Sequence, residues 1–110
     1  MSKNMMMRVV MQNAWAFVRD NGMTLSNALK VAWKNFKLKS MMMAGKAVKF
    51  TFKKVDGTIR TALGTLAQAA INYIPNGNGH SAPDTVQRFW DLENGGYRSF
   101  RKANLVDICL

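Results

Sequence analysis

A predicted β-hairpin over residues 47–66 is the feature that most constrains how this chain folds. Apolar and polar side chains alternate on both sides of Asp56-Gly57, as in half-buried strands. Asp-Gly favours a two-residue turn, because both central residues of a type I′ turn need positive φ. A two-residue turn predicts the following opposed residues: Val55 and Thr58, Phe52 and Thr61, Phe50 and Leu63, Val48 and Thr65.

This register predicts two chemically different faces of the hairpin. The inward, apolar face is expected to hold Val48, Phe50, Phe52, Ile59, Thr61, Leu63 and Thr65. The outward face is expected to carry Lys49, Lys53 and Arg60. An isolated two-stranded hairpin is marginally stable, so the rest of the chain must cover the phenylalanines.

Two amphipathic helices are predicted before the hairpin. The first spans residues 8–20 and groups Met11, Ala14, Trp15 and Val18 on one side, with Phe17 beside them. The second begins after the N-cap Thr24 and ends before Gly45. Its apolar stripe is Leu25, Leu29, Ala32, Trp33 and Phe36, and a different side carries Lys30, Lys34 and Lys37. We expect both apolar stripes to pack into the core.

A second hairpin is predicted over residues 86–102, with its turn at residues 93–96. If Asn94-Gly95 forms a two-residue turn, Phe89 lies opposite Phe100, Trp90 opposite Ser99, and Asp91 opposite Arg98. Arg88 and Arg101 then share the other face with Trp90. A last short strand or 3₁₀ turn follows at residues 104–108, anchored by Leu105, Val106 and Ile108.

The charge of the chain is strongly asymmetric. The net charge is +10, and residues 1–55, with eleven basic residues and one acid, carry all of it. Between Lys30 and Lys54 there are eight lysines and no acid. This predicts an anionic partner, with nucleic acid first and a membrane surface or an acidic protein behind it. The alternative is a solvated face that only aids solubility.

The sequence carries no catalytic or metal-binding signature, so we expect no enzymatic activity, no cofactor and no metal site. The single histidine, His80, lies in a predicted loop between Pro75 and Pro83, and the single cysteine is Cys109. Asp91 and Glu93 are the only close carboxylates, and Asp91 is expected to pair with Arg98. No apolar run is long enough to span a membrane, and the N-terminus does not resemble a secretory signal. Attachment to a membrane surface through the lysines of the second helix is not expected either, because the apolar face of that helix is needed for the core. A lone cysteine suits a reducing cytoplasm.

Residues 47–108 resemble a WYL-related family of Sm-like, SH3-type β-barrel proteins from Bacteroidetes and their phages and mobile elements. The resemblance is carried by VKFTF at 48–52, DGTIR at 56–60, GTL at 64–66, IP at 74–75, PD at 83–84, FWDLE at 89–93, YRSFR at 97–101 and NL at 104–105. Tyr97 stands where such proteins often have tryptophan. The preceding segment, with Ala32-Trp33 and the lysines after it, is also similar. The resemblance implies the barrel fold, and such barrels are associated with nucleic-acid or nucleotide binding.

The expected fold is therefore α+β: an N-terminal helical pair (residues 1–45) packed on a small SH3/Sm-like antiparallel β-barrel (residues 46–110), together one compact unit. The expected function is that of a small basic accessory protein of a phage or mobile element, which binds DNA or RNA in the cytoplasm of a bacterial host. Its expected phosphate contacts are Lys30, Lys34, Lys37, Lys49, Lys53, Arg60, Arg88, Arg98 and Arg101, and exposed Tyr97, Trp90 or Phe89 would stack on bases.

Two alternatives remain open at this stage. The protein-interaction alternative is a virion-associated component, or an inhibitor of a host nucleic-acid or defence machine, in which the basic surface meets a protein. Self-association is also open, because an unpaired barrel edge permits strand addition.

Overall fold

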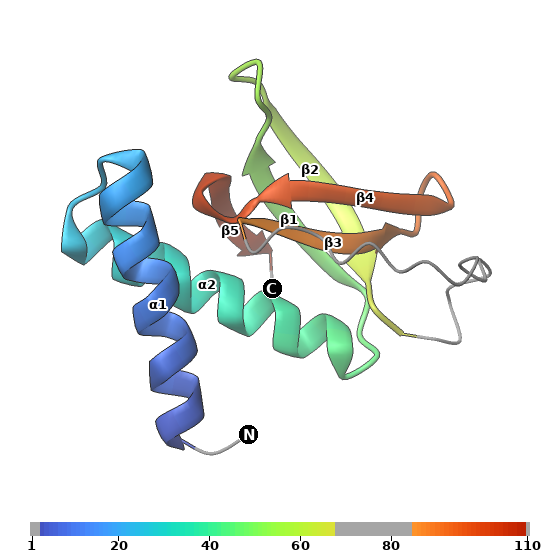
Figure 1. Ribbon diagram of the computed structural model, residues 1–110. Coiled ribbons are helices and arrows are strands. Elements are labelled where there is room, and N and C mark those ends of the chain that lie inside the picture. Colours follow the sequence, from blue (N-terminus) through green and yellow to red (C-terminus); the bar gives the residue numbers. More distant parts are fainter. Residues whose placement is uncertain (1–2, 68–84, 110) are drawn as a thin grey trace, which may run out of the picture.

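The computed structural model describes residues 3–67 and 85–109 (Figure 1). The predicted loop with His80 lies outside the described residues. The elements, in chain order, are α1 (Lys3–Asn21), α2 (Leu25–Met43), β1 (Val48–Lys53), β2 (Ile59–Thr65), β3 (Val86–Asp91), β4 (Gly96–Arg101), the 3₁₀ helix η2 (Lys102–Asn104) and β5 (Leu105–Cys109).

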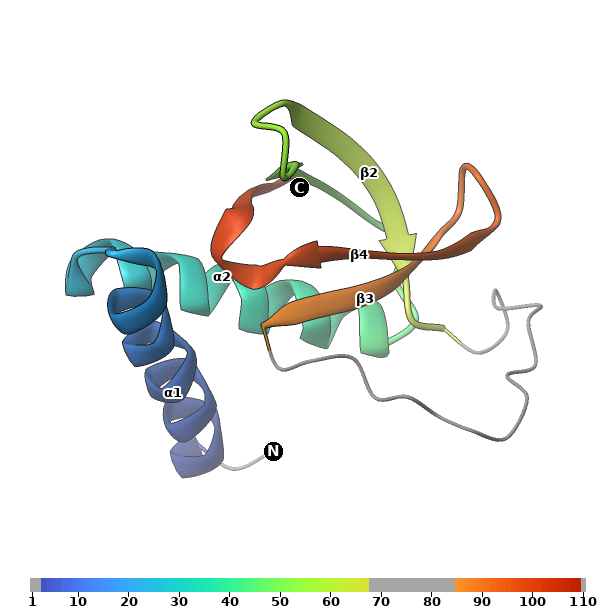
Figure 2. The same ribbon diagram turned by 45° about the horizontal axis from the view of Figure 1, so that its top comes forward.

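The five strands form one antiparallel sheet in the order β4-β3-β2-β1-β5. The β3–β4 hairpin crosses the β1–β2 hairpin instead of continuing in its plane (Figure 2). Only two residue pairs join β2 to β3: Gly64 with Asp91, and Thr65 with Trp90. The α+β class is as predicted, but the sheet is not closed, since β4 and β5 are its outer strands and do not pair with each other.

The core of the sheet is a cluster of four phenylalanines, Phe50, Phe52, Phe89 and Phe100, all at most 5% exposed. The ring centroids of Phe50 and Phe89 lie 5.0 Å apart in an edge-to-face contact, and those of Phe52 and Phe100 lie 5.3 Å apart in a stacked one. Aromatic pairs in these arrangements gain about 0.5–1.5 kcal/mol beyond the area they bury. The phenylalanines of the two hairpins therefore form one shared core.

Of the two helices, α2 lies nearer to the strands (Figure 1) and contributes to this core. Its Leu38 and Met42 are fully buried in the phenylalanine cluster. Asn35 links α2 to η2, because its Nδ2 donates to the carbonyl of Lys102 at 2.8 Å. Helix α1 packs on α2 through a second cluster formed mainly by Val10, Ala14, Phe17, Ala28 and Ala32.

The predicted apolar faces of both helices were partly wrong. The buried stripe of α1 is Val10, Ala14 and Phe17, and Trp15 is 50% exposed. On α2, the predicted core residues Leu25 and Trp33 are each 40% exposed. The contact between the helices combines three small alanines with Val10 and Phe17, and the two tryptophans lie outside it.

The first hairpin differs from its predicted register by one residue. Val48 pairs with Gly64, Phe50 with Ala62, and Phe52 with Arg60. The loop has three residues rather than two. Its ends are joined by a hydrogen bond from the Lys54 N–H to the Thr58 carbonyl at 2.7 Å, and the Gly57 N–H donates to the Lys54 carbonyl at 2.9 Å. Gly57 has a φ of +93°. The Asp56 carboxylate stabilises this loop by accepting from the Thr58 N–H and hydroxyl at 3.0 and 2.7 Å.

A one-residue slip exchanges the two faces of β2. Ala62 and Gly64 face the phenylalanines, whereas Ile59 is 59% exposed and Leu63 is half-buried. The predicted register fails because four phenylalanines fill the space above β2, so only small side chains fit there. Arg60 moves from the predicted outward face to the inward one.

The second hairpin also differs in register, but by two residues. Phe89 pairs with Arg98 and Trp90 with Tyr97, around a four-residue loop that starts at Leu92. A shift of two residues leaves each side chain on its predicted face. The predicted grouping of Phe89 with Phe100 is therefore confirmed, although the predicted direct pairs are wrong. In β5, Leu105 is buried as expected, but Val106 is 43% exposed.

Gly64→Ala is expected to lower the free energy of unfolding by about 1–3 kcal/mol, the usual cost of overpacking a core. A Cβ at this position would lie 2.7 Å from Cδ2 of Phe89 and 3.1 Å from Cε1 of Phe50. Urea denaturation measures the change. The matched control is Gly96→Ala in β4, where a Cβ meets no atom within 4 Å. Equal effects of the two substitutions would contradict the packing described here.

Candidate functional site

A basic groove of about 660 Å³ lies between the end of the β1–β2 hairpin and β4. We call it the cationic groove. Its basic lining residues are Lys53, Lys54, Arg60, Arg98 and Arg101. Among the described residues, Asp56 is the only acid that lines it, and Phe52, Val86 and Phe100 provide apolar lining.

The crossing of the two hairpins brings these basic residues together from three strands. Lys53 ends β1 and Lys54 follows it, Arg60 lies near the start of β2, and Arg98 and Arg101 lie on β4. No other described strand pairs with β4 on its outer side, and β4 faces the end of the first hairpin across the groove. Residues far apart in sequence thus form one cationic surface.

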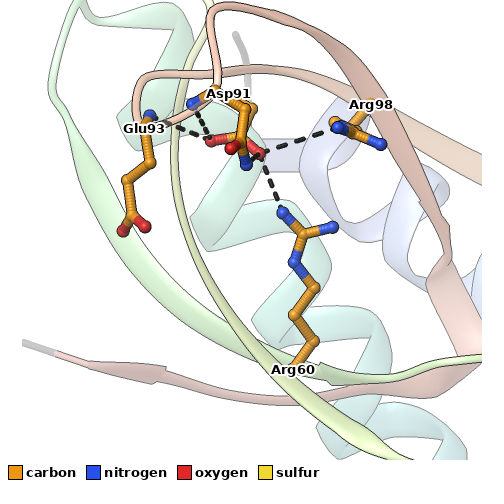
Figure 3. A network of polar contacts seen from close by, with 5 residues as sticks. Arg60, Asp91, Glu93 and Arg98 are labelled. Atoms are coloured by element: carbon orange, nitrogen blue, oxygen red, sulfur yellow. Dashed lines mark hydrogen bonds and ion pairs between the residues drawn. The ribbon is translucent and has the colours of Figure 1, made fainter.

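A buried carboxylate holds two of the groove arginines (Figure 3). Asp91 is 1% exposed, and its Oδ2 lies 2.9 Å from Nη2 of Arg60 and 3.9 Å from Nε of Arg98. Its Oδ1 accepts from the backbone N–H groups of Glu93 and Asn94 at 3.0 and 3.3 Å, and Asn94 Nδ2 donates to Oδ2 at 2.9 Å. A single side chain therefore fixes the loop after β3 and the Arg60 guanidinium, and Arg98 lies close to the same carboxylate.

The pKa of the Asp91 carboxyl is lowered from its ordinary value. The largest single influence, desolvation by burial, raises this pKa, but hydrogen bonds from Asn94 and Glu93 and the charge of Arg60 together outweigh it. Asp91 is thus ionised at neutral pH. Its negative charge offsets one of the positive charges of the groove, and the groove remains net cationic.

The structure brings together four of the nine predicted site residues: Lys53, Arg60, Arg98 and Arg101. Arg60 reaches the groove only because the register differs from the predicted one, since it was expected on the outward face of the hairpin. Lys54 belongs to the groove but was not among the predicted site residues, although it lies within the lysine-rich segment. The pairing of Arg60 with Asp91 has no local sequence signal, because the two residues are 31 positions apart.

The other five predicted residues lie elsewhere on the surface. Lys30 and Lys37 are exposed on α2, and Lys34 points to β5, where its Nζ donates to the carbonyl of Val106 at 3.0 Å. Lys49 is exposed on β1 beside Cys109 of β5. The guanidinium of Arg88 lies 4.8 Å above the ring of Tyr97 on β4.

The aromatic residues proposed to stack on bases are mostly unsuited to it. Phe89 is fully buried in the core, and Trp90 is 7% exposed with its ring edge-on to Tyr97 at 5.1 Å. These two predictions were wrong. Tyr97 is half-buried, and Arg88 lies over its ring.

Within residues 3–67 and 85–109, no three His, Cys, Asp or Glu side chains lie close enough to hold a metal ion. No helix in the same part of the chain is long and apolar enough to cross a membrane. The predicted pairing of Asp91 with Arg98 is present as an ion pair, although the two residues are diagonal neighbours rather than directly opposite.

Residues 30–106 match the family model described as WYL_2, Sm-like SH3 beta-barrel fold. The matched segment, 77 of the 110 residues, begins within α2 and ends in β5. The match runs across the boundary predicted between the helical segment (residues 1–45) and the barrel (residues 46–110). That boundary stays a prediction. No curated protein and no solved structure gives a significant match to the chain.

Asp91→Asn is expected to lower the free energy of unfolding by about 1.5–3 kcal/mol, the range for hydrogen bonds to a charged group. The change removes the charge that Arg60 and Arg98 share while keeping the size of the side chain. Chemical denaturation at pH 7 measures the loss. The control is Asp107→Asn, whose carboxylate is exposed and 3.9 Å from Lys34, and for which we expect less than about 1 kcal/mol.

The stabilisation from Asp91 is expected to depend on pH. Because its pKa is lower in the folded chain than in the unfolded one, the contribution is complete above about pH 4 and is lost as the pH falls through the folded pKa. Denaturation of the wild type and of Asp91→Asn between neutral and acidic pH tests this. The stability difference between them should shrink below about pH 4. A stability difference that grows on acidification would contradict the conclusion that Asp91 is ionised at neutral pH.

Proposed function

The chain belongs to the WYL_2 family of Sm-like SH3 β-barrel proteins, and we propose that it is a small non-enzymatic protein that binds nucleic acid through the cationic groove. The observation that supports this most is the convergence of five basic side chains on one groove. Phosphates of DNA or RNA are the ligands that such a surface attracts, with affinity that falls as salt rises and with little sequence choice.

The arrangement of the arginines also favours phosphate. The Arg60 side chain is 30% exposed and that of Arg98 is 52% exposed, so both remain accessible. The hydrogen bond to Asp91 restricts the motion of Arg60. A guanidinium held in place presents planar, paired donors that match phosphate oxygens. Lys53 and Lys54, at the rim formed by the first hairpin, add point charges without a fixed geometry.

Basic residues outside the groove extend its positive electrostatic potential over more of the surface. Lys30, Lys37 and Lys49 are exposed, and no acid interrupts the segment from residue 30 to residue 54. Such a distribution speeds the encounter with a polyanion even where the side chains make no direct contact. The proposal therefore includes a general attraction to nucleic acid and a specific contact in the groove.

The proposed biological setting is an accessory protein of a phage or mobile element in the cytoplasm of a bacterial host. This rests on the family resemblance noted from the sequence, and a chain with one free, exposed cysteine suits a reducing compartment.

A protein-interaction factor is the second candidate, and one observation favours it. Val55 and Ile59, near the end of the first hairpin, are 80% and 59% exposed beside Lys53 and Lys54. A partner with an acidic and apolar surface, such as a component of a host nucleic-acid machine or of a virion, would bury them. The two candidates differ in whether affinity resides in nucleic acid alone or requires a protein. Self-association through the outer edges of β4 and β5 is a further proposal.

The nucleic-acid proposal predicts a steep salt dependence that the groove controls. Fluorescence anisotropy with labelled single-stranded DNA, duplex DNA and RNA at several salt concentrations measures it. In Lys53→Gln/Arg101→Gln, the slope of log affinity against log salt should fall by about 0.7–0.9 for each phosphate contact removed. The control is Lys39→Gln/Lys46→Gln, which removes the same charge from exposed residues that do not line the groove and should change the slope less.

Two results would contradict the proposal. The first is the absence of binding to all three nucleic acids near physiological salt, which would favour the protein partner. The second is an equal effect of the two double variants, which would show that net charge acts without the groove.

A further inference from the structure

An exposed tryptophan on α2 lies between two lysines, away from the cationic groove. Trp33 is 40% exposed, and Lys30 and Lys37 are exposed one turn before it and one turn after it. Positions i, i+3 and i+7 of an α-helix share one side, so the three side chains form a continuous strip. We call this strip, Lys30, Trp33 and Lys37, the Trp33 platform.

The indole of Trp33 is held by its neighbour on the helix. Its ring lies edge-on to that of Phe36, with centroids 6.2 Å apart and planes at 80°. Phe36 is half-buried against the contact between the two helices. This contact limits the motion of the indole in the unbound protein, so less conformational entropy is lost when a flat ligand stacks on it.

The charged residues of the helix that carries the indole are all basic. Helix α2 contains no acidic residue, and the lysines that flank Trp33 lie about 10 Å apart along the helix axis. Lys34 is directed to β5, where it contacts the carbonyl of Val106 and lies 3.9 Å from Asp107. The exposed strip thus presents one aromatic surface with a cation on each side.

We propose that the Trp33 platform stacks an unpaired base of single-stranded nucleic acid, with Lys30 and Lys37 contacting the phosphates on either side. Aromatic side chains combined with cations that follow the backbone are the general means of binding single strands. In a duplex the base faces are covered by their neighbours, so the platform discriminates between the two forms. This inference rests on the proposed function and specifies its substrate as single-stranded.

The test compares Trp33→Ala with Trp15→Ala in the full chain. Trp15 is the matched control, because it is 50% exposed on α1 and is not flanked by lysines. The one basic residue within a turn of it, Arg19, lies 3.6 Å from the acid Asp20. The probe is a labelled oligothymidylate of about twenty nucleotides, long enough for one small binding domain. Trp33→Ala should weaken binding by about 5- to 150-fold, the range for loss of one stacked base. Trp15→Ala should leave the affinity unchanged.

Three further readouts separate stacking from a general loss of affinity. Trp33→Tyr, which keeps an aromatic face, should recover part of the binding. The slope of log affinity against log salt should stay constant in Trp33→Ala but fall by about 0.7 per lysine in Lys30→Gln/Lys37→Gln. An oligomer of the same length without bases should bind the wild type and Trp33→Ala equally.

The outcomes distinguish this inference from the function it rests on. If the wild type binds oligothymidylate and Trp33→Ala binds it equally well, the platform is excluded and the groove proposal stands. An equal loss of duplex and single-strand affinity in Trp33→Ala would also overturn base stacking. If the wild type binds neither form of nucleic acid, both proposals fail together.

Discussion

The ion pair between Asp91 and Arg60 is the interaction on which the relation of the two hairpins depends. Only two backbone residue pairs connect β2 to β3, and one of them includes Asp91. The carboxylate also closes the loop after β3 and lies 3.9 Å from Arg98 on β4. One buried charge thus links the two hairpins, orients Arg60 and lies close to Arg98, two of the cations that line the groove (Figure 3).

The sequence allowed both hairpins to be located but not their registers. In the first hairpin, the packing of small residues against the phenylalanines is one cause. The loops are another: the Asp56 carboxylate accepts the Thr58 N–H, and the Asp91 carboxylate accepts those of Glu93 and Asn94, which stabilises loops of three and four residues instead of two. The two errors have unequal consequences, because a shift of one residue exchanges faces and a shift of two does not. Arg60 was therefore assigned to the wrong face, whereas Arg98 and Phe100 were assigned correctly.

The surface of the helices was difficult to predict for a related reason. Periodicity identifies which residues share a side of a helix, but the partner determines which side is buried. Ala14, Ala28 and Ala32 form much of the buried contact between the two helices, whereas Trp15 and Trp33 lie outside it and are exposed. The same packing that contradicts the predicted apolar stripe leaves Trp33 exposed between lysines. Charge asymmetry indicated an anionic partner, but only the fold divides the basic residues into a groove and a helical strip.

The most direct test of the central claim is to map which backbone amides change when a short single-stranded oligonucleotide is added to the ¹⁵N-labelled protein. We predict that chemical shifts change along the end of the first hairpin and β4, at Lys53, Lys54, Arg98 and Arg101, and on the exposed side of α2. The outer face of β3, at Arg88, should change little. Shifts confined to that face, or no shifts at low salt, would contradict the assignment of the cationic groove as a nucleic-acid site.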